Sequence, residues 1–304
     1  MLKNILVTGG CGFVGSHLVE NLMRLGHNVT ILDRCSSEKK TNLPAKLNLV
    51  KGDIRDDKLL RKLLKNSDVC FHLAAVLSPE SYDNNLDETR QVNFLATNSL
   101  FEIAASLQNP PTIIYASSSA VYGNNDNLPL CETEIGKPLS AYGIDKLNCE
   151  SSAATAERNY GLKTIGLRFF NIYGPQNWSK TCFGITPKII EAAKNKEPIV
   201  IYGDGTQIRD FLYIQDAVDA LIAAMNFEND TSEIINICSG VPTSINDLVK
   251  EIQKLTNASD MNYVNKHHNG DVRLSFGDTA KAQKLLNWKA KIDLSEGLLR
   301  TILN

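Results

Sequence analysis

The sequence predicts an α/β fold: a doubly wound parallel sheet with a smaller, discontinuous C-terminal domain. Strand-like and helix-like runs alternate from the first residues onward, which is typical of β-α-β units. The strand-like runs are short and apolar, as in Val69-Cys70-Phe71, and such strands are usually covered by helices on both faces. The first strand also leads into a glycine-rich turn that opens a helix. These features indicate a parallel sheet between two layers of helices.

The expected elements follow one another in a regular order. Strands are predicted at 4–8, 28–33, 47–51, 69–73, 112–117, 163–168 and 234–238, and helices at 13–25, 56–65, 86–107 and 214–225. Beyond Asn171, Gly-Pro, Pro-Lys and Gly-Asp-Gly breakers loosen the pattern. We therefore expect a first domain from residues 1–170 plus 211–240, and a second from residues 171–210 plus 241–304. Ser244 and Asp247 fit a capping box for the helix that follows them.

Composition narrows the classes of partner. The chain has 304 residues and a hydrophobic content of 43%, which is enough for a full core. Its formal charge of −2 leaves no broad basic field, so nucleic acid and anionic membrane surfaces are poor partners. No apolar run approaches the roughly 20 residues that span a bilayer. The seven cysteines form no CxxC pair, so we expect no disulfide framework, no metal site and a cytoplasmic location.

The turn after the first strand predicts a dinucleotide site. Gly10, Gly12 and Gly15 form a GxGxxG motif between a strand and a helix. Glycines allow the tight turn and the close approach of the backbone to a pyrophosphate at the positive end of the helix. Asp33 ends the next strand about 20 residues on, where a carboxylate binds the adenosine ribose and repels a 2′-phosphate. NAD is therefore the expected cofactor, although Arg34 slightly weakens the preference over NADP.

Tyr142 and Lys146 are spaced so that a helix places the phenol and the ammonium on one face. An ordinary phenol has a pKa of about 10, so a tyrosine that acts as a base near neutral pH needs nearby positive charge. A cation about 6 Å away contributes roughly 2.8 kcal/mol at an effective dielectric constant of about 20, and the nicotinamide adds a second charge. The spacing alone also suits a solvated helix face. Here it follows a dinucleotide motif and the segment SSSAVYG at 117–123.

These motifs resemble those of the extended short-chain dehydrogenase/reductase family, in particular its NAD-dependent sugar-nucleotide epimerase and dehydratase branch. The resemblance covers essentially the whole chain and includes TGGxGFxGSH at 8–17 and RFFNIYGP at 168–175. It implies Ser118, Tyr142 and Lys146 as catalytic residues, with Ser118 relaying a proton between the sugar O4 and the tyrosine. The implied cofactor-binding residues are Gly9, Gly12, Phe13, Val14, Gly15, Asp33, Asp53, Ile54, Ala74, Asn93, Tyr142 and Lys146.

The same resemblance implies a substrate site that draws on the second domain. Asn171, Arg209 and Arg273 would hold the diphosphate, with a surface ion pair to Asp210 as the alternative role of Arg209. The implied substrate-binding residues are Ser118, Asn171, Tyr202, Arg209, Asp271, Arg273 and Ser275. In the family Tyr202 corresponds to an aromatic residue that contacts uracil and Asp271 to an acid that binds ribose.

Two positions bear on the choice of substrate. Ser275 lies four residues after Asp271, where 4-epimerases of the family face the C2 substituent of the sugar; a turn-capping role is the alternative. The family often has an arginine three residues before that aspartate, and this chain has His268 there. Either Arg273 supplies the phosphate charge alone, or His268 contributes weakly to it. The pair His267-His268 lacks a third ligand at useful spacing, so it predicts no metal site.

One further position selects the reaction. Dehydratases and decarboxylases of the branch carry an acidic residue directly before the VYG motif, and this chain has Ala120. The expected activity is therefore epimerisation at C4 of a nucleotide sugar, UDP-hexose or UDP-N-acetylhexosamine, through a transient 4-keto intermediate. A 4-keto reductase, an epimerase at another carbon and a catalytically silent NAD-binding regulator remain alternatives. The resemblance also implies a homodimer through a four-helix bundle, formed by the helix around Phe94 and the helix after Tyr142.

Overall fold

The computed structural model describes residues 1–35, 47–77, 85–176, 184–228, 231–258, 261–264 and 272–303. Asp271, His267 and His268 lie outside these ranges. Within them, no helix is long and apolar enough to cross a bilayer.

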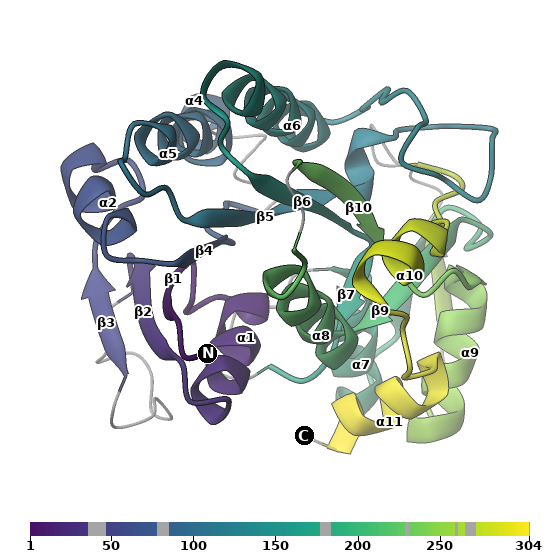
Figure 1. The fold of residues 1–304 in the computed structure, drawn as a ribbon. Helices are drawn as coiled ribbons and strands as arrows, with labels where there is room; N and C mark the ends of the chain where they lie inside the picture. The colour runs from purple at the N-terminus through teal and green to yellow at the C-terminus, as the bar shows by residue number, and fades with distance from the viewer. Residues whose placement is uncertain are drawn as a thin grey trace.

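A seven-stranded parallel sheet forms the centre of the molecule (Figure 1). Its strands are β1 (Asn4–Thr8), β2 (Asn28–Asp33), β3 (Asn48–Lys51), β4 (Val69–His72), β5 (Thr112–Ser118), β6 (Thr164–Phe169) and β10 (Glu233–Ile237). The strand order is β10-β6-β5-β4-β1-β2-β3, and each neighbouring pair is parallel. The order reverses between β1 and β4, and ligands of doubly wound sheets bind beyond the carboxyl ends of strands at such a point. The predicted fold class is confirmed.

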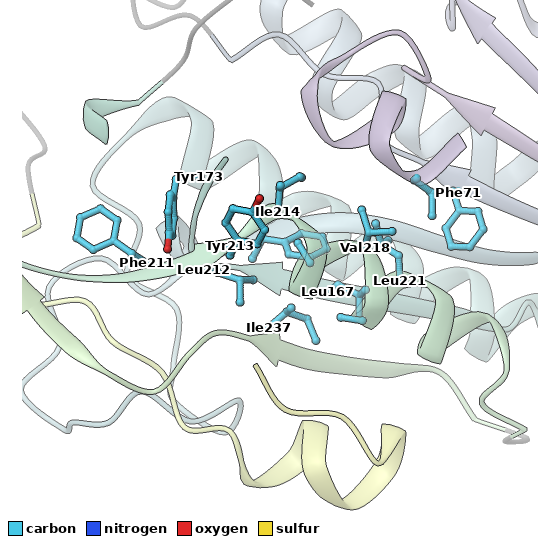
Figure 2. Packing of buried hydrophobic residues seen from close by; sticks show 14 of the residues in the cluster. Phe71, Leu167, Tyr173, Phe211, Leu212, Tyr213, Ile214, Val218, Leu221 and Ile237 are labelled. Atoms are coloured by element: carbon cyan, nitrogen blue, oxygen red, sulfur yellow. The ribbon is translucent and has the colours of Figure 1, made fainter. Parts of the chain in front are cut away.

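Helices cover both faces of this sheet, as Figure 1 shows. One layer contains α1 (Phe13–Arg24) and α8 (Ile214–Met225), and the other contains α2 (Asp57–Leu64), α5 (Ala96–Ala105) and α6 (Ala141–Tyr160). The side chains of β1 alternate between the two layers. Ile5 and Val7 belong to one hydrophobic cluster and Leu6 to the other, which is the two-residue periodicity of a strand. Figure 2 shows part of the first cluster, with Leu167 of β6 near Val218 and Leu221 of α8.

The long helix expected at 86–107 is interrupted. It consists of α4 (Leu86–Arg90), a π-helical turn, η2 (Gln91–Leu95), and α5. The carbonyl oxygen of Asn93 accepts hydrogen bonds from the Thr97 hydroxyl at 2.8 Å and the Cys149 thiol at 3.2 Å. Single π turns inside helices are frequent at functional sites. Here the turn carries Asn93, one of the residues expected at the cofactor.

The remaining elements gather at one end of the sheet. A three-stranded sheet has the order β11-β9-β7, with β7 at Asn171–Tyr173, β9 at Ile208–Tyr213 and β11 at Pro242–Ser244. A two-stranded sheet pairs β8 (Ile199–Tyr202) with β12 (Met261–Val264). The helices here are α7 (Ile185–Asn195), α9 (Ile245–Thr256), α10 (Ala280–Leu286) and α11 (Leu294–Leu303).

The chain enters this region after β6 and returns to the large sheet at β10 before it leaves again. Ser244 caps α9 as expected, because its hydroxyl accepts a hydrogen bond of 3.0 Å from the backbone N–H of Asp247. One hydrophobic cluster contains Val7 of β1, Ile189 of α7 and Leu248 of α9. A continuous core therefore joins the large sheet to the C-terminal elements, and the expected domain boundaries stay a prediction.

Candidate active site

The glycine loop between β1 and α1 is packed so closely that side chains are excluded from it. A Cβ added to Gly15 would lie 2.3 Å from the carbonyl oxygen of Gly9, and one added to Gly9 would lie 2.7 Å from the backbone nitrogen of Ala74. Gly9 also has a φ of +70°, which favours glycine. Helix α1 begins after Gly12 without a side-chain cap. This end of the helix therefore offers backbone N–H groups and a positive dipole to an anion.

Asp33 lies beside this loop at the carboxyl end of β2. Its Oδ2 accepts a hydrogen bond of 3.0 Å from the backbone N–H of Cys11, and its Oδ1 accepts one of 3.0 Å from that of Cys35. Parallel pairing of β1 with β2, which places Thr8 opposite Leu32, brings the ends of the two strands to the same edge. The carboxylate is thus held next to the glycine loop, at the position expected for a ribose-binding group.

The loop after β4 is held by Asn93 on the π-helical turn. The amide of Asn93 accepts a hydrogen bond from the backbone N–H of Val76 at 2.7 Å and donates one to its carbonyl at 2.9 Å. Ala74 in the same loop contacts Gly9. Ala74 and Asn93 therefore lie in one structural unit with the glycine loop, which fits their expected place at the cofactor.

Asp53 and Ile54, which we expected at the adenine, lie after β3. Ile54 is buried in the hydrophobic cluster with Leu32 and Leu60. The Asp53 carboxylate accepts hydrogen bonds from the guanidinium of Arg55, of 2.9 Å from Nε and 2.7 Å from Nη2. These hydrogen bonds hold the pKa of Asp53 below its ordinary value.

The three expected catalytic residues come together where β5 ends and α6 begins. Lys146 is buried, and its Nζ lies 5.7 Å from the centre of the Tyr142 ring. The same Nζ donates a hydrogen bond of 2.6 Å to the carbonyl oxygen of Ala116 in β5. Ser118 is the last residue of β5, and its Oγ accepts a hydrogen bond of 3.1 Å from the N–H of Ala120. The short helix η3 (Ser119–Val121) follows.

Glycine at the residue after Tyr142 allows this approach. A Cβ added to Gly143 would lie 2.6 Å from the carbonyl oxygen of Ala120. Ser140 caps α6, because its hydroxyl accepts a hydrogen bond of 3.1 Å from the N–H of Gly143. The first turn of α6 is thus held against the segment that carries Ser118.

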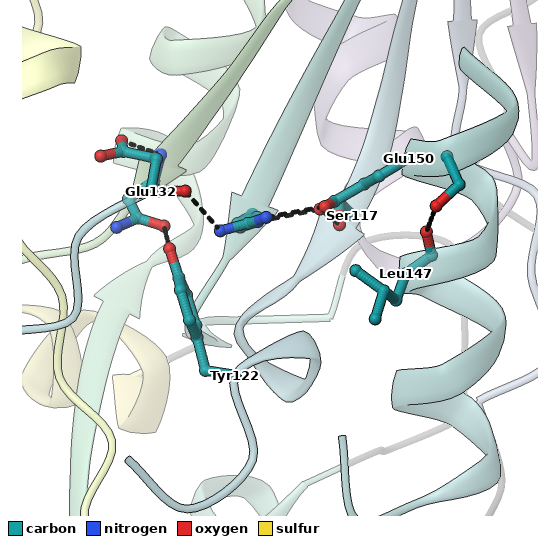
Figure 3. A network of polar contacts seen from close by, with 8 residues as sticks. Ser117, Tyr122, Glu132, Leu147 and Glu150 are labelled. Atoms are coloured by element: carbon teal, nitrogen blue, oxygen red, sulfur yellow. Dashed lines mark hydrogen bonds and ion pairs between the residues drawn. The ribbon is translucent and has the colours of Figure 1, made fainter. Parts of the chain in front are cut away.

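A buried polar network supports the end of β5 (Figure 3). The Ser117 hydroxyl donates to Glu150, and Glu150 binds the Arg168 guanidinium through two hydrogen bonds of 2.9 and 2.7 Å. Arg168 stacks over the Tyr122 ring at 4.7 Å, and the Tyr122 hydroxyl donates to Asn236 at 2.7 Å. Burial disfavours the charged guanidinium, but the bonds and charge of Glu150 outweigh it and raise the pKa of Arg168.

Sequence reasoning missed Glu150 and Arg168 as site-building residues. A signal for Glu150 was present. Tyr142, Lys146 and Glu150 recur every four residues, so all three lie on the face of α6 that meets β5. No comparable spacing links Glu150 to Arg168, because their contact depends on the pairing of β5 with β6.

His72 is a packed strand residue and takes no place among the proposed catalytic groups. Its Nδ1 lies 2.7 Å from the Thr8 hydroxyl and its Nε2 lies 2.8 Å from the Thr97 hydroxyl. Burial and the nearby positive charge of Lys146 lower the pKa of His72 to about 3. The imidazole is therefore neutral at physiological pH.

Apart from Ser118, which ends β5, the described residues expected at the substrate lie on the C-terminal elements. The segment of Arg273 and Ser275 runs beside β9: the Ile208 N–H donates to the Arg273 carbonyl at 2.9 Å, and the Ser275 N–H donates to the Ile208 carbonyl at 3.1 Å. Arg209 follows Ile208 directly, so the three expected residues share one short stretch. Asn171 begins the neighbouring strand β7, and Tyr202 ends β8. Asp271 lies outside the described residues, as does His268.

Asp210, the alternative ion-pair partner of Arg209, has a different environment from the one expected. It is fully buried. Its Oδ1 accepts hydrogen bonds of 2.7 Å from the backbone N–H and the hydroxyl of Ser239, and its Oδ2 accepts from the N–H groups of Gly240 and Gly277. Asp210 therefore joins β9 to the turn after β10 and to the segment that carries Ser275, and it does not form a surface ion pair.

Comparison with known proteins identifies the family of the chain. The model of the NAD dependent epimerase/dehydratase family matches residues 5–238. The structure of a UDP-N-acetylglucosamine 4-epimerase from Methanobrevibacter ruminantium, in complex with UDP-N-acetylmuramic acid, is 35% identical with a TM-score of 0.90, covering 99% of this chain and 97% of that one. A UDP-glucose 4-epimerase from Thermotoga maritima, solved with UDP-glucose, is 33% identical with a TM-score of 0.90 and the same coverage.

A relative with different chemistry is similar over the same length. The UDP-N-acetyl-alpha-D-glucosaminuronate decarboxylase of Bacillus cytotoxicus is 33% identical over 99% of this chain and 97% of its own. At 99% coverage, its similarity extends over the glycine loop, the segment from Ser118 to Lys146 and the C-terminal elements. From the family match and these similarities, the chain belongs to the NAD dependent epimerase/dehydratase family.

Proposed function

We propose that this protein catalyses the NAD-dependent epimerisation of a UDP-hexose or UDP-N-acetylhexosamine at C4, through a transient 4-keto sugar. The observation that carries the proposal is the placement of Tyr142, Lys146 and Ser118 at the junction of β5 and α6. This junction lies beyond the carboxyl ends of the central strands, on the side of the sheet where the glycine loop also lies.

The residues around the glycine loop fit NAD. The uncapped start of α1 after Gly12 suits the pyrophosphate, and Asp33 suits a ribose with free hydroxyls. Gly9 packs against Ala74, and Asn93 holds the loop that contains Ala74, beside the start of α1. The expected cofactor set is completed by Phe13, Val14, Gly15, Asp53 and Ile54. When bound, NAD supplies the acceptor and donor of the C4 hydride.

The chain's own residues handle the proton. Tyr142 removes the proton of the sugar O4, and Ser118 relays it across the gap between them. The Nζ of Lys146 lies 5.7 Å from the centre of the Tyr142 ring, so its positive charge is placed beside the proposed base. The Ala116 carbonyl occupies one ammonium proton of Lys146, which leaves the others for the nicotinamide ribose.

Epimerisation requires that the diphosphate is held while the sugar turns over between the two hydride transfers. Asn171, Arg209 and Arg273 are the groups that would hold the diphosphate, and Tyr202 and Asp271 would hold the nucleoside. Ala120 lies between Ser118 and the buried Tyr122 and offers no carboxyl group to drive the loss of a substituent from the keto sugar. Because one relative is a decarboxylase, the activity test has to distinguish epimerisation from decarboxylation.

A homodimer is part of the proposal. Leu86 of α4, Leu95 of η2 and Ile144 of α6 are large apolar side chains with exposed fractions of 38%, 50% and 42%. The helices that carry them pack together in one layer. Burial of these side chains in a four-helix bundle between two copies would remove this apolar surface from water. Equilibrium sedimentation of the parent chain and of Leu95→Glu tests it, and a parent chain that stays monomeric at micromolar concentration would overturn it.

The activity itself is tested by NMR with UDP-, dTDP- and GDP-sugars as candidate substrates. The proposal expects interconversion of a pair of C4 epimers with catalytic NAD and no net accumulation of NADH. Stoichiometric consumption of reduced cofactor would indicate a 4-keto reductase instead. Release of carbon dioxide from a UDP-uronic acid would indicate decarboxylation. NAD binding without turnover of any substrate would indicate a silent regulator.

A further inference from the structure

Three side chains with metal-binding atoms meet beside the glycine loop. Cys11 lies between β1 and α1, Asp33 ends β2, and Cys35 follows two residues later. The sulfur atoms of both cysteines and a carboxylate oxygen of Asp33 all lie within 4.8 Å of one another. Cys11 is buried, and the other two are partly buried. In sequence the two cysteines are far apart, which is why their number and spacing predicted no metal site.

The backbone fixes this arrangement. The N–H groups of Cys11 and Cys35 each donate a hydrogen bond of 3.0 Å to the Asp33 carboxylate, one to each oxygen. The carboxylate is thereby held between the two cysteines. A carboxylate has about four lone-pair positions, so these two bonds leave it able to bind a further group. The ligand set therefore needs little ordering to form.

We propose that Cys11, Asp33 and Cys35 form a binding site for a thiophilic divalent cation of the zinc class. Two thiolates and one carboxylate suit such a cation, whereas magnesium and calcium prefer oxygen ligands alone. A tetrahedral zinc ion with Zn–S bonds of about 2.3 Å holds two sulfurs roughly 3.8 Å apart. Because the two sulfur atoms lie within 4.8 Å of each other, side-chain rotations that move them by about 1 Å or less would bring them to that separation. Water would take the fourth position.

The groups around the proposed metal site offset the negative charge of its ligands. Two thiolates and a carboxylate carry three negative charges, and the cation neutralises two of them. Helix α1 begins at Phe13, two residues after Cys11, and its positive end stabilises the remaining charge. Arg34, between Asp33 and Cys35, adds a cation nearby. Binding releases the thiol protons, so affinity for the metal rises with pH.

The site has a consequence for the cofactor, and this part rests on the proposed function. Asp33 is the group proposed to hold the adenosine ribose. The hydrogen bonds from Cys11 and Cys35 leave about one lone-pair position on each carboxylate oxygen, so a metal ion on one oxygen would leave only one position for the two ribose hydroxyls. The cation and NAD would therefore exclude each other. A metal ion on Asp33 would keep the chain from loading its dinucleotide.

The metal site is tested by titrating the full-length chain, reduced and freed of dinucleotide, with Co²⁺. The proposal expects a thiolate-to-cobalt charge-transfer band and the intense visible bands of a tetrahedral ion, saturating at one equivalent and abolished by Zn²⁺. Cys35→Ser should weaken the binding by more than about 100-fold, because a direct ligand matters more than its outer hydrogen-bond partners. Cys131→Ser is the matched control, since Cys131 is a partly buried cysteine that bonds elsewhere, to Thr133.

Absence of the charge-transfer band in the reduced parent, or a band that persists unchanged in Cys35→Ser, would overturn the site. Competition is measured separately, by NAD titration at several Zn²⁺ concentrations. We expect the apparent Kd for NAD to rise in proportion to Zn²⁺ in the parent and to stay constant in Cys35→Ser. Cobalt binding without any effect on NAD would support the metal site and contradict the ribose assignment of Asp33, so the two failures are distinguishable.

Discussion

Lys146 donates a hydrogen bond of 2.6 Å from its Nζ to the carbonyl oxygen of Ala116. This bond joins the helix that carries Tyr142 to the strand that ends at Ser118. One turn further along α6, Glu150 accepts a hydrogen bond from Ser117. Successive residues of β5 are thus bound by successive turns of α6, which fixes the register between the proposed proton relay and the proposed base.

The first prediction concerns Tyr142. Tyr142→Phe keeps the ring and removes the hydroxyl, so NAD content should stay near that of the parent while kcat falls by roughly 10²- to 10⁴-fold or more. Steady-state kinetics with the substrate found by NMR, together with the bound NAD per chain, provides the measurement. Tyr160→Phe, at the exposed end of the same helix, is the matched control and should keep full activity. Activity of the Tyr142 variant within about tenfold of the parent would remove the tyrosine from the mechanism.

A second prediction concerns the carboxylate at the end of β2. Asp33→Ala should raise the Kd for NAD by about 10- to 100-fold, because a charge-assisted hydrogen bond contributes roughly 1.5 to 3 kcal/mol. It should also reduce discrimination against NADP, since the repulsion of a 2′-phosphate disappears. Fluorescence titration with both dinucleotides measures this, with Asp87→Ala on the first turn of α4 as a control. Unchanged titrations would mean that other groups hold the ribose.

The buried pair Glu150 and Arg168 leads to a third prediction. Both side chains are 7% exposed, so Glu150→Ala leaves a buried guanidinium without its carboxylate and should lower the free energy of unfolding by about 3 to 5 kcal/mol. Glu296→Ala breaks the exposed pair with Arg300 and should cost about 1 kcal/mol or less. Urea unfolding measures both. Equal, small losses in the two variants would show that the buried network does not hold β5 against α6.

His72 makes stability depend on pH. Because its pKa is about 3 in the folded protein and about 6.5 in an unfolded chain, the unfolded state binds more protons between these values. The contribution of the neutral imidazole is fully present above about pH 6.5 and is lost as the pH falls toward about 3, by up to roughly 1.4 kcal/mol per unit.

The measurement compares the parent with His72→Gln in urea at about pH 7.5 and about pH 5. We expect the parent's advantage in unfolding free energy to shrink by roughly 1 to 2 kcal/mol at the lower pH. Other titrating groups are common to both proteins and cancel. A difference that does not change with pH would contradict the neutral, buried state of this histidine.

Sequence patterns predicted those parts of the structure that depend on local periodicity. The strand positions of the large sheet and the parallel arrangement of its strands followed from short apolar runs that alternate with helices, and the YxxxK spacing placed Tyr142 and Lys146 on one helix face. Helix 86–107 was predicted without its π turn, because the hydrogen bonds to the Asn93 carbonyl come partly from Cys149 on another helix. Nothing in the local sequence of either helix encodes that contact.

Contacts that depend on which strands are neighbours in the sheet could not be predicted from sequence patterns either. Cys11 and Cys35 meet because β1 and β2 end at the same edge, and Glu150 meets Arg168 because β5 pairs with β6. The burial of Asp210 also depends on three N–H groups from two separate segments, the turn at Ser239 and Gly240 and the segment at Gly277. Such clusters become predictable only when the strand order is known.

The last prediction concerns the breadth of the substrate site. Ser275 is buried, with an exposed fraction of 6%, and its backbone is bonded to Ile208 beside Arg209. If its side chain faces the C2 substituent of the sugar, serine leaves room for an N-acetyl group, and the enzyme should accept UDP-N-acetylglucosamine or its galacto epimer as well as UDP-glucose. Ser275→Tyr should then reduce kcat/KM for the N-acetyl substrate far more than for the plain hexose. Overpacking a filled site costs about 1 to 3 kcal/mol, which corresponds to about 5- to 150-fold in the ratio of the two kcat/KM values.

Ser275→Ala removes the hydroxyl without adding volume and should leave that ratio within about threefold of the parent. An equal loss on both substrates in Ser275→Tyr would mean that Ser275 supports the turn beside β9 and does not face C2.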